Sequence, residues 1–339
     1  MFRVSSARYL HVGDATLYSA RRACLSATRC GINNSDTHRP LIRHASTQQC
    51  HQQRVQSSDL MCLAAQSLNY AKQPDHVGQI ASELQRTGIL KISLQFPDPD
   101  SQYLEHLLLS LHQHHGHQLP IGHSATRGWF WDVRPSSNTS TRRFQSGNDH
   151  QARSETMDDF PWHTDCSYEN PPPRFFALHV LQHDRYGGGT LSLMNVERLG
   201  EHLSPATRDA LGRSEFVMTI PPEFKKDPNR QNIVGSVLSG TAADCVPTMR
   251  FREDILEPTT ERAAEALAEL RQVIQAQKTE AMGTKGSTMH LSADQLPAGS
   301  IVLVNNRRWL HARNHINDPD RHLRRVRWDA VPFGANPAA

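Results

Sequence analysis

The sequence lacks paired cysteine spacings and long apolar runs. Its six cysteines include no C-x-x-C pair, and no apolar segment of the secretory type precedes them. A disulfide scaffold or a structural zinc site is therefore not expected, and a reducing compartment fits better. No stretch approaches the roughly 20 consecutive apolar residues that a membrane helix requires, so we expect no membrane association.

Lysine and glutamate are absent from residues 1–58, which contain eight arginines and only two aspartates. This serine-rich segment also has no sustained apolar run. We therefore expect residues 1–58 to form a disordered or targeting N-terminal tail, and residues 59–339 to form one catalytic domain. The composition is typical of a mitochondrial transit peptide as well as of a disordered extension, so a cytoplasmic location is expected, with the mitochondrial matrix as the alternative.

The remainder of the chain has little net charge. Without residues 1–58 it contains 29 basic and 32 acidic residues, which leaves a net charge of −3 although the whole chain carries +3. A slightly acidic domain does not favour a nucleic-acid surface, because such surfaces depend on clustered lysine and arginine. We expect a small-molecule substrate rather than a nucleic-acid partner.

Strands outnumber helices after Gly128. Apolar spacing before that point predicts a helix that ends at Gly88, a following strand, and a second helix that leads into a histidine-rich turn. The later pattern predicts a long helix over residues 259–278, with Thr259 or Thr260 as its cap, and strands at 128–133, 175–181, 190–194, 300–305 and 322–331. This order indicates a mainly β fold with an antiparallel core and an inserted helical segment.

The segment Pro161-Trp-His-Thr-Asp165 offers two metal ligands. Residues two apart on an extended strand point the same way, so His163 and Asp165 can present an imidazole and a carboxylate to one ion. The pair alone is weak evidence, because a chain with twenty histidines and 34 acidic residues contains about two such pairs by chance. A third ligand must come from elsewhere.

His311 is the candidate third ligand, because it follows an apolar strand and a turn in Ile301-Val-Leu-Val-Asn-Asn-Arg-Arg-Trp-Leu-His311. Two histidines and one carboxylate are the ligand set of non-haem Fe(II) oxygenases, which leave positions open for a co-substrate and dioxygen. A zinc hydrolase uses the same three ligand types, so these residues alone do not decide the metal.

Residues 78–335 resemble the taurine dioxygenase and clavaminate synthase-like family of Fe(II)/2-oxoglutarate-dependent oxygenases. That family has a W/F-H-T-D segment and, about 27 residues after its histidine, G-G-[GDT]-T. Here Gly187-Gly-Gly-Thr190 follows His163 at that spacing. The family also has a D-N-R-R-x-x-H-[GA]-R segment, which appears here as Asn305-Asn-Arg-Arg-Trp-Leu-His-Ala-Arg313, with asparagine in place of the first aspartate. The family's R-[HW]-L-x-R segment follows it and appears here as Arg321-His-Leu-Arg-Arg325.

The resemblance implies a double-stranded β-helix, or jelly roll, with flanking helices, and it assigns roles to residues. By resemblance His163, Asp165 and His311 bind Fe(II), and Thr190 and Arg321 bind the distal carboxylate of 2-oxoglutarate. Arg325 is expected near the metal-side carboxylate or the substrate. The implied reaction uses dioxygen, releases succinate and CO2, and hydroxylates, desaturates or cyclises a small substrate of the carboxylate, amino-acid or secondary-metabolite type.

Residues before the metal motif are candidates for substrate contacts, since relatives place a substrate lid there. Trp129 and Trp131 lie in an aromatic strand, and Arg142 and Arg143 lie in a polar loop that could hold an anionic group. The alternative is that the tryptophans belong to the core and the arginines are solvated.

Two other classes of protein remain open. A cupin-like metal-dependent hydrolase or isomerase would keep the three metal ligands but has no use for Thr190, Arg321 and Arg325. A non-catalytic jelly-roll binding protein would need none of the three ligands.

Overall fold

The computed structural model describes residues 60–122, 128–135, 152–240, 246–279 and 287–334. The tail predicted over residues 1–58 lies outside these ranges, so its role and the cellular location stay predictions. Within the described ranges, no helix has the length and apolar character needed to cross a membrane.

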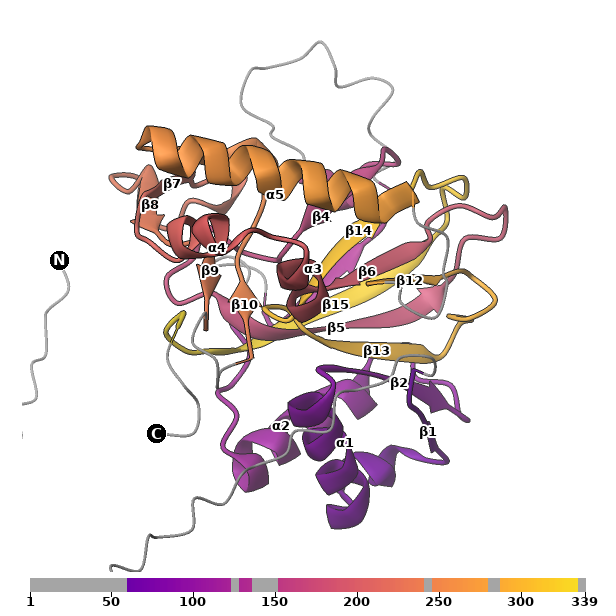
Figure 1. The fold of residues 1–339 in the computed structure, drawn as a ribbon. Helices are drawn as coiled ribbons and strands as arrows, with labels where there is room; N and C mark the ends of the chain where they lie inside the picture. The colour runs from indigo at the N-terminus through magenta and orange to yellow at the C-terminus, as the bar shows by residue number, and fades with distance from the viewer. Residues whose placement is uncertain (1–59, 123–127, 136–151, 241–245, 280–286, 335–339) are drawn as a thin grey trace, which may run out of the picture. The chain divides into compact units, whose positions relative to one another are not determined.

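Two β-sheets form the centre of the fold (Figure 1). The larger sheet has six strands in the order β1 (Cys62–Ala65), β2 (Ile89–Leu94), β13 (Ser300–Asn305), β5 (Pro173–Gln182), β15 (His322–Ala330) and β3 (Phe130–Val133). The smaller sheet has four, in the order β12 (Thr288–Leu291), β6 (Leu191–Asn195), β14 (Trp309–Arg313) and β4 (Phe160–His163). The mainly β architecture predicted from the sequence is confirmed.

Side chains from both sheets share one apolar cluster. It contains Phe176 and Leu178 from β5, Leu193 from β6, and Val302 and Val304 from β13. Because successive residues of a strand point to opposite faces, these alternate positions define the inner faces of the two sheets. The intervening residues define the outer faces, which helices cover.

Helices cover the outer face of each sheet. The helices α1 (Pro74–Arg86) and α2 (Gln102–His115) pack with the six-stranded sheet through a cluster that includes Ile80, Leu104 and Trp328. On the four-stranded sheet, α3 (Val196–Glu201), α4 (Pro205–Leu211) and α5 (Glu261–Thr279) share a cluster with Trp162 and Leu310. Figure 1 shows α5 passing above β4 and β14, while α1 and α2 lie beside β2.

The predicted helices and strands are largely confirmed. The helix α1 ends before Gly88, whose φ of +77° suits glycine, and α5 begins where Thr260 Oγ1 accepts a hydrogen bond from Ala263 N at 3.2 Å. Between β6 and α5, the helices α3 and α4 and several shorter elements were not predicted. The shorter elements are β7 (Phe216–Thr219), β8 (Asn232–Gly235), β9 (Leu238–Ser239), β10 (Thr248–Met249), β11 (Leu256–Pro258) and 3-10 turns at Pro222–Phe224 and Glu253–Ile255.

Candidate metal centre

Strand pairing brings the two predicted histidine ligands together. His163 ends β4 and lies directly opposite His311 on the antiparallel strand β14. Paired residues of neighbouring antiparallel strands point to the same face, and their ring centroids here are 4.1 Å apart. Each ring packs on a phenylalanine, Phe160 for His163 and Phe176 for His311. The imidazoles are therefore buried on the inner face of the sheet.

Asp165 reaches the same point from a turn rather than from a strand. We predicted that His163 and Asp165 would share an extended strand, but β4 ends at His163 and Asp165 begins a turn. The backbone has left the strand conformation there, since Cys166 has a φ of +53°, which an extended strand does not adopt. The turn still aims the carboxylate at the two imidazoles, so the predicted convergence occurs by a different local geometry.

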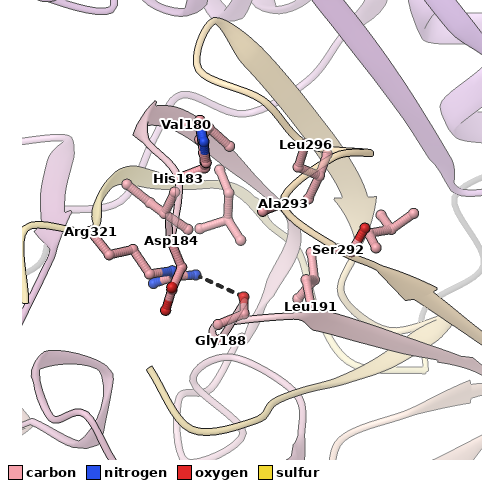
Figure 2. A pocket seen from close by; sticks show the side chains of 13 residues that line it. Val180, His183, Asp184, Gly188, Leu191, Ser292, Ala293, Leu296 and Arg321 are labelled. Atoms are coloured by element: carbon pink, nitrogen blue, oxygen red, sulfur yellow. Dashed lines mark hydrogen bonds between the residues drawn. The ribbon is translucent and has the colours of Figure 1, made fainter. Parts of the chain in front are cut away.

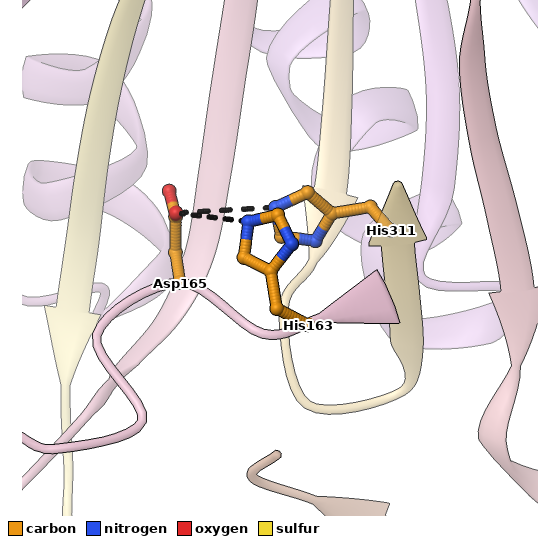
Figure 3. A group of neighbouring side chains, drawn as sticks. All are labelled: His163, Asp165 and His311. Carbon is orange, nitrogen blue, oxygen red and sulfur yellow. Dashed lines mark ion pairs between the residues drawn. The ribbon is translucent and has the colours of Figure 1, made fainter. Parts of the chain in front are cut away.

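The three side chains form a compact, buried group (Figure 3). Asp165 Oδ1 lies 3.9 Å from His163 Nε2 and 3.9 Å from His311 Nε2, and all three residues are buried. Ligands at right angles around one ion, with bonds of roughly 2.0–2.2 Å, lie about 3 Å apart. All three ligand atoms lie within 4.8 Å of one another, so a contraction of less than about 2 Å would let them bind one metal ion.

The unpaired atoms of the group also fit a metal ion. His163 Nε2 and Asp165 Oδ2 are buried and make no hydrogen bond within the described residues. His163 Nδ1 lies 2.7 Å from the carbonyl oxygen of Pro161, which can only accept, so Nδ1 carries the proton and Nε2 keeps its lone pair. A buried nitrogen with a free lone pair beside a carboxylate is what a cation requires.

Protonation states of the group favour a bound cation. Burial lowers the pKa of both histidines, to about 4 for His311, so the imidazoles are neutral at neutral pH. Burial alone would raise the pKa of Asp165, but Arg325 and Arg327 outweigh it and hold that pKa well below its usual range. The carboxylate is therefore ionised, and the three residues present one negative charge and two neutral nitrogen ligands.

Two buried arginines from β15 lie beside the carboxylate. Arg325 Nη1 donates to Asp165 Oδ1 at 3.1 Å, and Arg327 Nη1 donates to Cys166 Sγ. Both guanidinium groups are buried, and Arg325 Nε makes no hydrogen bond within the described ranges. Two cations beside one carboxylate leave this region positively charged, which favours an anionic ligand.

Arg321 lies in a separate apolar pocket. The pocket is lined by Arg321 and Asp184 and by apolar side chains that include Leu178, Leu191 and Leu323 (Figure 2). Arg321 Nη2 donates to the carbonyl of Gly189 at 3.4 Å, while Nη1 is buried without a partner in the described part of the chain. Burial, with a smaller effect of nearby Arg313, lowers the pKa of Arg321 to about 9, so it remains charged at neutral pH.

A buried carboxylate fixes the glycine turn beside Arg321. Asp184 accepts hydrogen bonds from the backbone N–H groups of Tyr186, Asn317 and Asp318 at 2.7–3.1 Å, and so ties residues 186–189 to the loop before β15. Thr190 is held by its own N–H, which donates to Asn314 Oδ1 at 2.7 Å. Thr190 precedes β6 rather than beginning it as predicted, and its role stays a prediction.

The predicted substrate residues separate into three groups. Trp131 lies opposite Arg325 in the β3–β15 pairing and belongs to the inner cluster. Trp129 instead packs on the outer cluster with α1 and α2, so its position does not support a substrate contact. Arg142 and Arg143 lie outside the described residues.

Sequence reasoning missed two residues beside the candidate metal centre. Arg327 follows Arg325 by two positions on a strand, so the alternation of β15 could have placed both on one face. Asn306 donates to the carbonyl oxygen of Asp165 and accepts from its N–H, although 141 residues separate them. Asn306 belongs to the Asn305-Asn-Arg-Arg motif, but the motif alone does not show that its side chain contacts Asp165.

Comparison with known proteins shows three informative similarities. L-asparagine oxygenase of Streptomyces coelicolor is 30% identical over 169 residues, which is 49% of this chain and 46% of the relative, so the chain matches under half of that protein's length. A structure of asparagine oxygenase with Fe(II), 2S,3S-3-hydroxyasparagine and succinate has a TM-score of 0.58 and 19% identity, covering 78% of this chain and 92% of the other. The non-heme iron oxygenase OrfP, with Fe and alpha-ketoglutaric acid, has a TM-score of 0.55 and 19% identity, covering 77% and 82%.

The two structural similarities concern the fold, since their sequence identity is low. The family match is broader, because residues 64–327 match the family described as taurine catabolism dioxygenase TauD, TfdA. This range contains both predicted motifs, from His163 through Arg325. The chain belongs to the taurine catabolism dioxygenase TauD, TfdA family.

Proposed function

We propose that this protein is an Fe(II)- and 2-oxoglutarate-dependent oxygenase that oxidises a small amino-acid-like substrate. The observation that carries the proposal is the buried convergence of His163, Asp165 and His311, whose ligand atoms lie within 4.8 Å of one another, with His163 Nε2 left without a hydrogen bond in the described part of the chain. In this family the two-sheet core corresponds to a double-stranded β-helix, and we propose that topology here. The inner face of the smaller sheet supplies the two histidines, and the turn after β4 supplies Asp165.

The three residues would hold the iron, leaving its other positions for 2-oxoglutarate and dioxygen. Iron, when bound, supplies the oxidative decarboxylation of 2-oxoglutarate to succinate and CO2 that is coupled to oxidation of a substrate C–H bond. The protein's contribution is geometric and electrostatic. Phe160 and Phe176 keep water from the imidazoles, while Arg325 keeps Asp165 ionised.

We propose that the arginines bind the carboxylates of 2-oxoglutarate. Arg321 offers a buried, unpaired Nη1 in an apolar pocket, which suits the distal carboxylate. Arg325 lies beside the metal ligand, which suits a carboxylate or substrate group near the iron. A cupin-like hydrolase or a binding protein would have no use for two buried guanidinium groups in this register, so their placement favours the oxygenase.

The relatives support an amino acid as the substrate. The asparagine oxygenase structure contains hydroxylated asparagine, and a further structure of OrfP, with a TM-score of 0.55, contains hydroxylated arginine. The positive region formed by Arg325 and Arg327 would attract the substrate's carboxylate. Trp131, on the same inner face as Arg325, is the remaining predicted substrate residue within the described chain.

The proposed activity is tested first without a substrate. Anaerobic addition of Fe(II) and 2-oxoglutarate should produce a weak visible charge-transfer band, and His311→Ala should abolish it. Free amino acids are then screened for substrate-dependent succinate release. A protein that binds zinc but gives neither the band nor succinate would exclude the oxygenase in favour of a hydrolase or isomerase.

Gly189→Ala is expected to weaken 2-oxoglutarate binding by displacing Arg321. A Cβ atom at residue 189 would lie 2.6 Å from Arg321 Nε, and the φ of +66° adds backbone strain of about 1–2 kcal/mol. Gly187→Ala is the matched control, because Gly187 has a similar φ of +83° but its Cβ would meet nothing within 4 Å. Calorimetric titration should show weaker binding only in Gly189→Ala. Equal affinities in both variants would contradict the role of Arg321.

A further inference from the structure

We propose that Asn306 is a positioning residue that holds the backbone of Asp165 where its carboxylate can bind the metal. The inference rests on the proposed function, since it concerns how one of the three ligands is oriented. Asn306 itself faces the backbone of Asp165 and not the carboxylate. Its effect on the metal would therefore act entirely through Asp165.

The side chain of Asn306 forms a two-way contact with Asp165. Asn306 Oδ1 accepts a hydrogen bond from Asp165 N at 2.7 Å, and Asn306 Nδ2 donates to Asp165 O at 2.9 Å. Nδ2 also donates to Pro173 O at 3.0 Å, at the start of β5. The residue is 1% exposed, so these hydrogen bonds have no competition from water.

The position of Asn306 links the two ligand-bearing segments. It occupies the turn between β13 and β14, five residues before His311, and its own N–H donates to Arg174 O at 2.8 Å. The segment of Asp165 is thereby tied to the turn that leads into the strand of His311. A movement of either segment would break these bonds, so the turn fixes the spacing between the carboxylate and the imidazole.

A second anchor holds the same segment from its other side. Thr164 N donates to Phe251 O at 2.7 Å, and Phe251 N donates to Thr164 Oγ1 at 3.0 Å. Thr164 and Asp165 are thus each held by a pair of hydrogen bonds to different parts of the chain. Because the turn at Asp165 lies beyond the end of β4, sheet pairing does not hold it there, and the Asn306 contact replaces that restraint.

Only a carboxamide can make this set of contacts. Aspartate has the same shape and can accept from Asp165 N, but its ionised side chain cannot donate to the carbonyls of Asp165 and Pro173. Asn306→Asp therefore removes two donations without creating a cavity. Asn305→Asp is the matched control, because Asn305 is also buried and ends β13 directly before the turn, but its Oδ1 accepts from Arg307 N rather than from Asp165 N.

The test measures the affinity of the purified full-length protein for Fe(II) under anaerobic conditions, by calorimetry. Asn306→Asp and Asn306→Ala should bind Fe(II) about 10–100-fold more weakly than the wild type, the usual effect of losing a group that orients a metal ligand. Asn305→Asp should bind as the wild type does. A negative charge added near a cation site would by itself strengthen binding, so a fall in Asn306→Asp indicates lost geometry rather than altered charge.

The outcomes separate this inference from the proposed function. If the wild type does not bind Fe(II), the proposed function fails. If the wild type binds and folded Asn306→Asp binds equally well, even with a lower melting temperature, Asn306 is only structural and the inference is wrong. If both variants fail to fold, hydrogen exchange of the Asp165 N–H is measured in the wild type instead. Slow exchange that Fe(II) slows further supports the inference, and rapid exchange overturns it.

Discussion

Asp165→Ala is expected to abolish Fe(II) binding and, independently, to destabilise the metal-free protein by about 3–5 kcal/mol. The first effect follows because one of three ligands is lost. The second follows because Asp165 pairs with Arg325 at 3.1 Å in a site where both side chains are less than a tenth exposed. The variant would leave Arg325 and Arg327 buried without that carboxylate, and a buried unpaired charge is costly.

Urea denaturation of the metal-free protein measures the second effect separately from the first. The double variant Asp165→Ala/Arg325→Met should recover part of the lost stability, because it removes the uncompensated cation as well. It should not recover Fe(II) binding. An Asp165→Ala protein as stable as the wild type would show that water or another group neutralises Arg325, and would contradict the pairing seen here.

Arg321→Ala is expected to raise the concentration of 2-oxoglutarate needed for half-maximal binding by at least about 30-fold. The loss of a buried partner for a carboxylate costs on the order of 2–5 kcal/mol, and each 1.4 kcal/mol is about tenfold in affinity. Arg321→Lys should recover only part of the affinity, since an ammonium group cannot make the two parallel bonds of a guanidinium. Fe(II) affinity measured without 2-oxoglutarate should change little in either variant.

Arg324→Ala provides the control for this prediction. Arg324 lies three residues after Arg321, on the outer face of β15, where it donates to Asp132 and to the carbonyl of Pro99. Its loss should leave 2-oxoglutarate affinity unchanged. If Arg321→Ala also binds 2-oxoglutarate normally, the distal carboxylate must bind elsewhere, and Arg325 becomes the next candidate.

The main elements and the ligand residues could be read from the sequence. Apolar periodicity predicted α1, α2 and α5 together with β5, β13 and β15, because burial of one face imposes a period of 3.6 or 2 on the chain. The motifs around His163 and His311 predicted three residues that the structure brings within 4.8 Å. That part was predictable since each motif is short and its spacing is set by one strand or turn.

Alternation along a strand predicted which residues share a face, but not which neighbours each face meets. It could not show that Trp131 lies inside with Arg325 while Trp129 packs against the outer helices. The turn at Asp165 escaped prediction for a related reason. Its backbone is fixed by Asn306, a residue far along the chain, and propensity describes only local preferences.

The sequence by itself determined the ligand types, the family motifs and the strands that present them. Only the tertiary structure decided how the carboxylate is held, which arginines compensate it, and which tryptophan lies on the inner face with Arg325. The physical reason is that these contacts join segments more than a hundred residues apart, as with Asn306 and Asp165 or Arg325 and Asp165. Such contacts depend on how two sheets pack, and packing is a property of the whole chain rather than of any local segment.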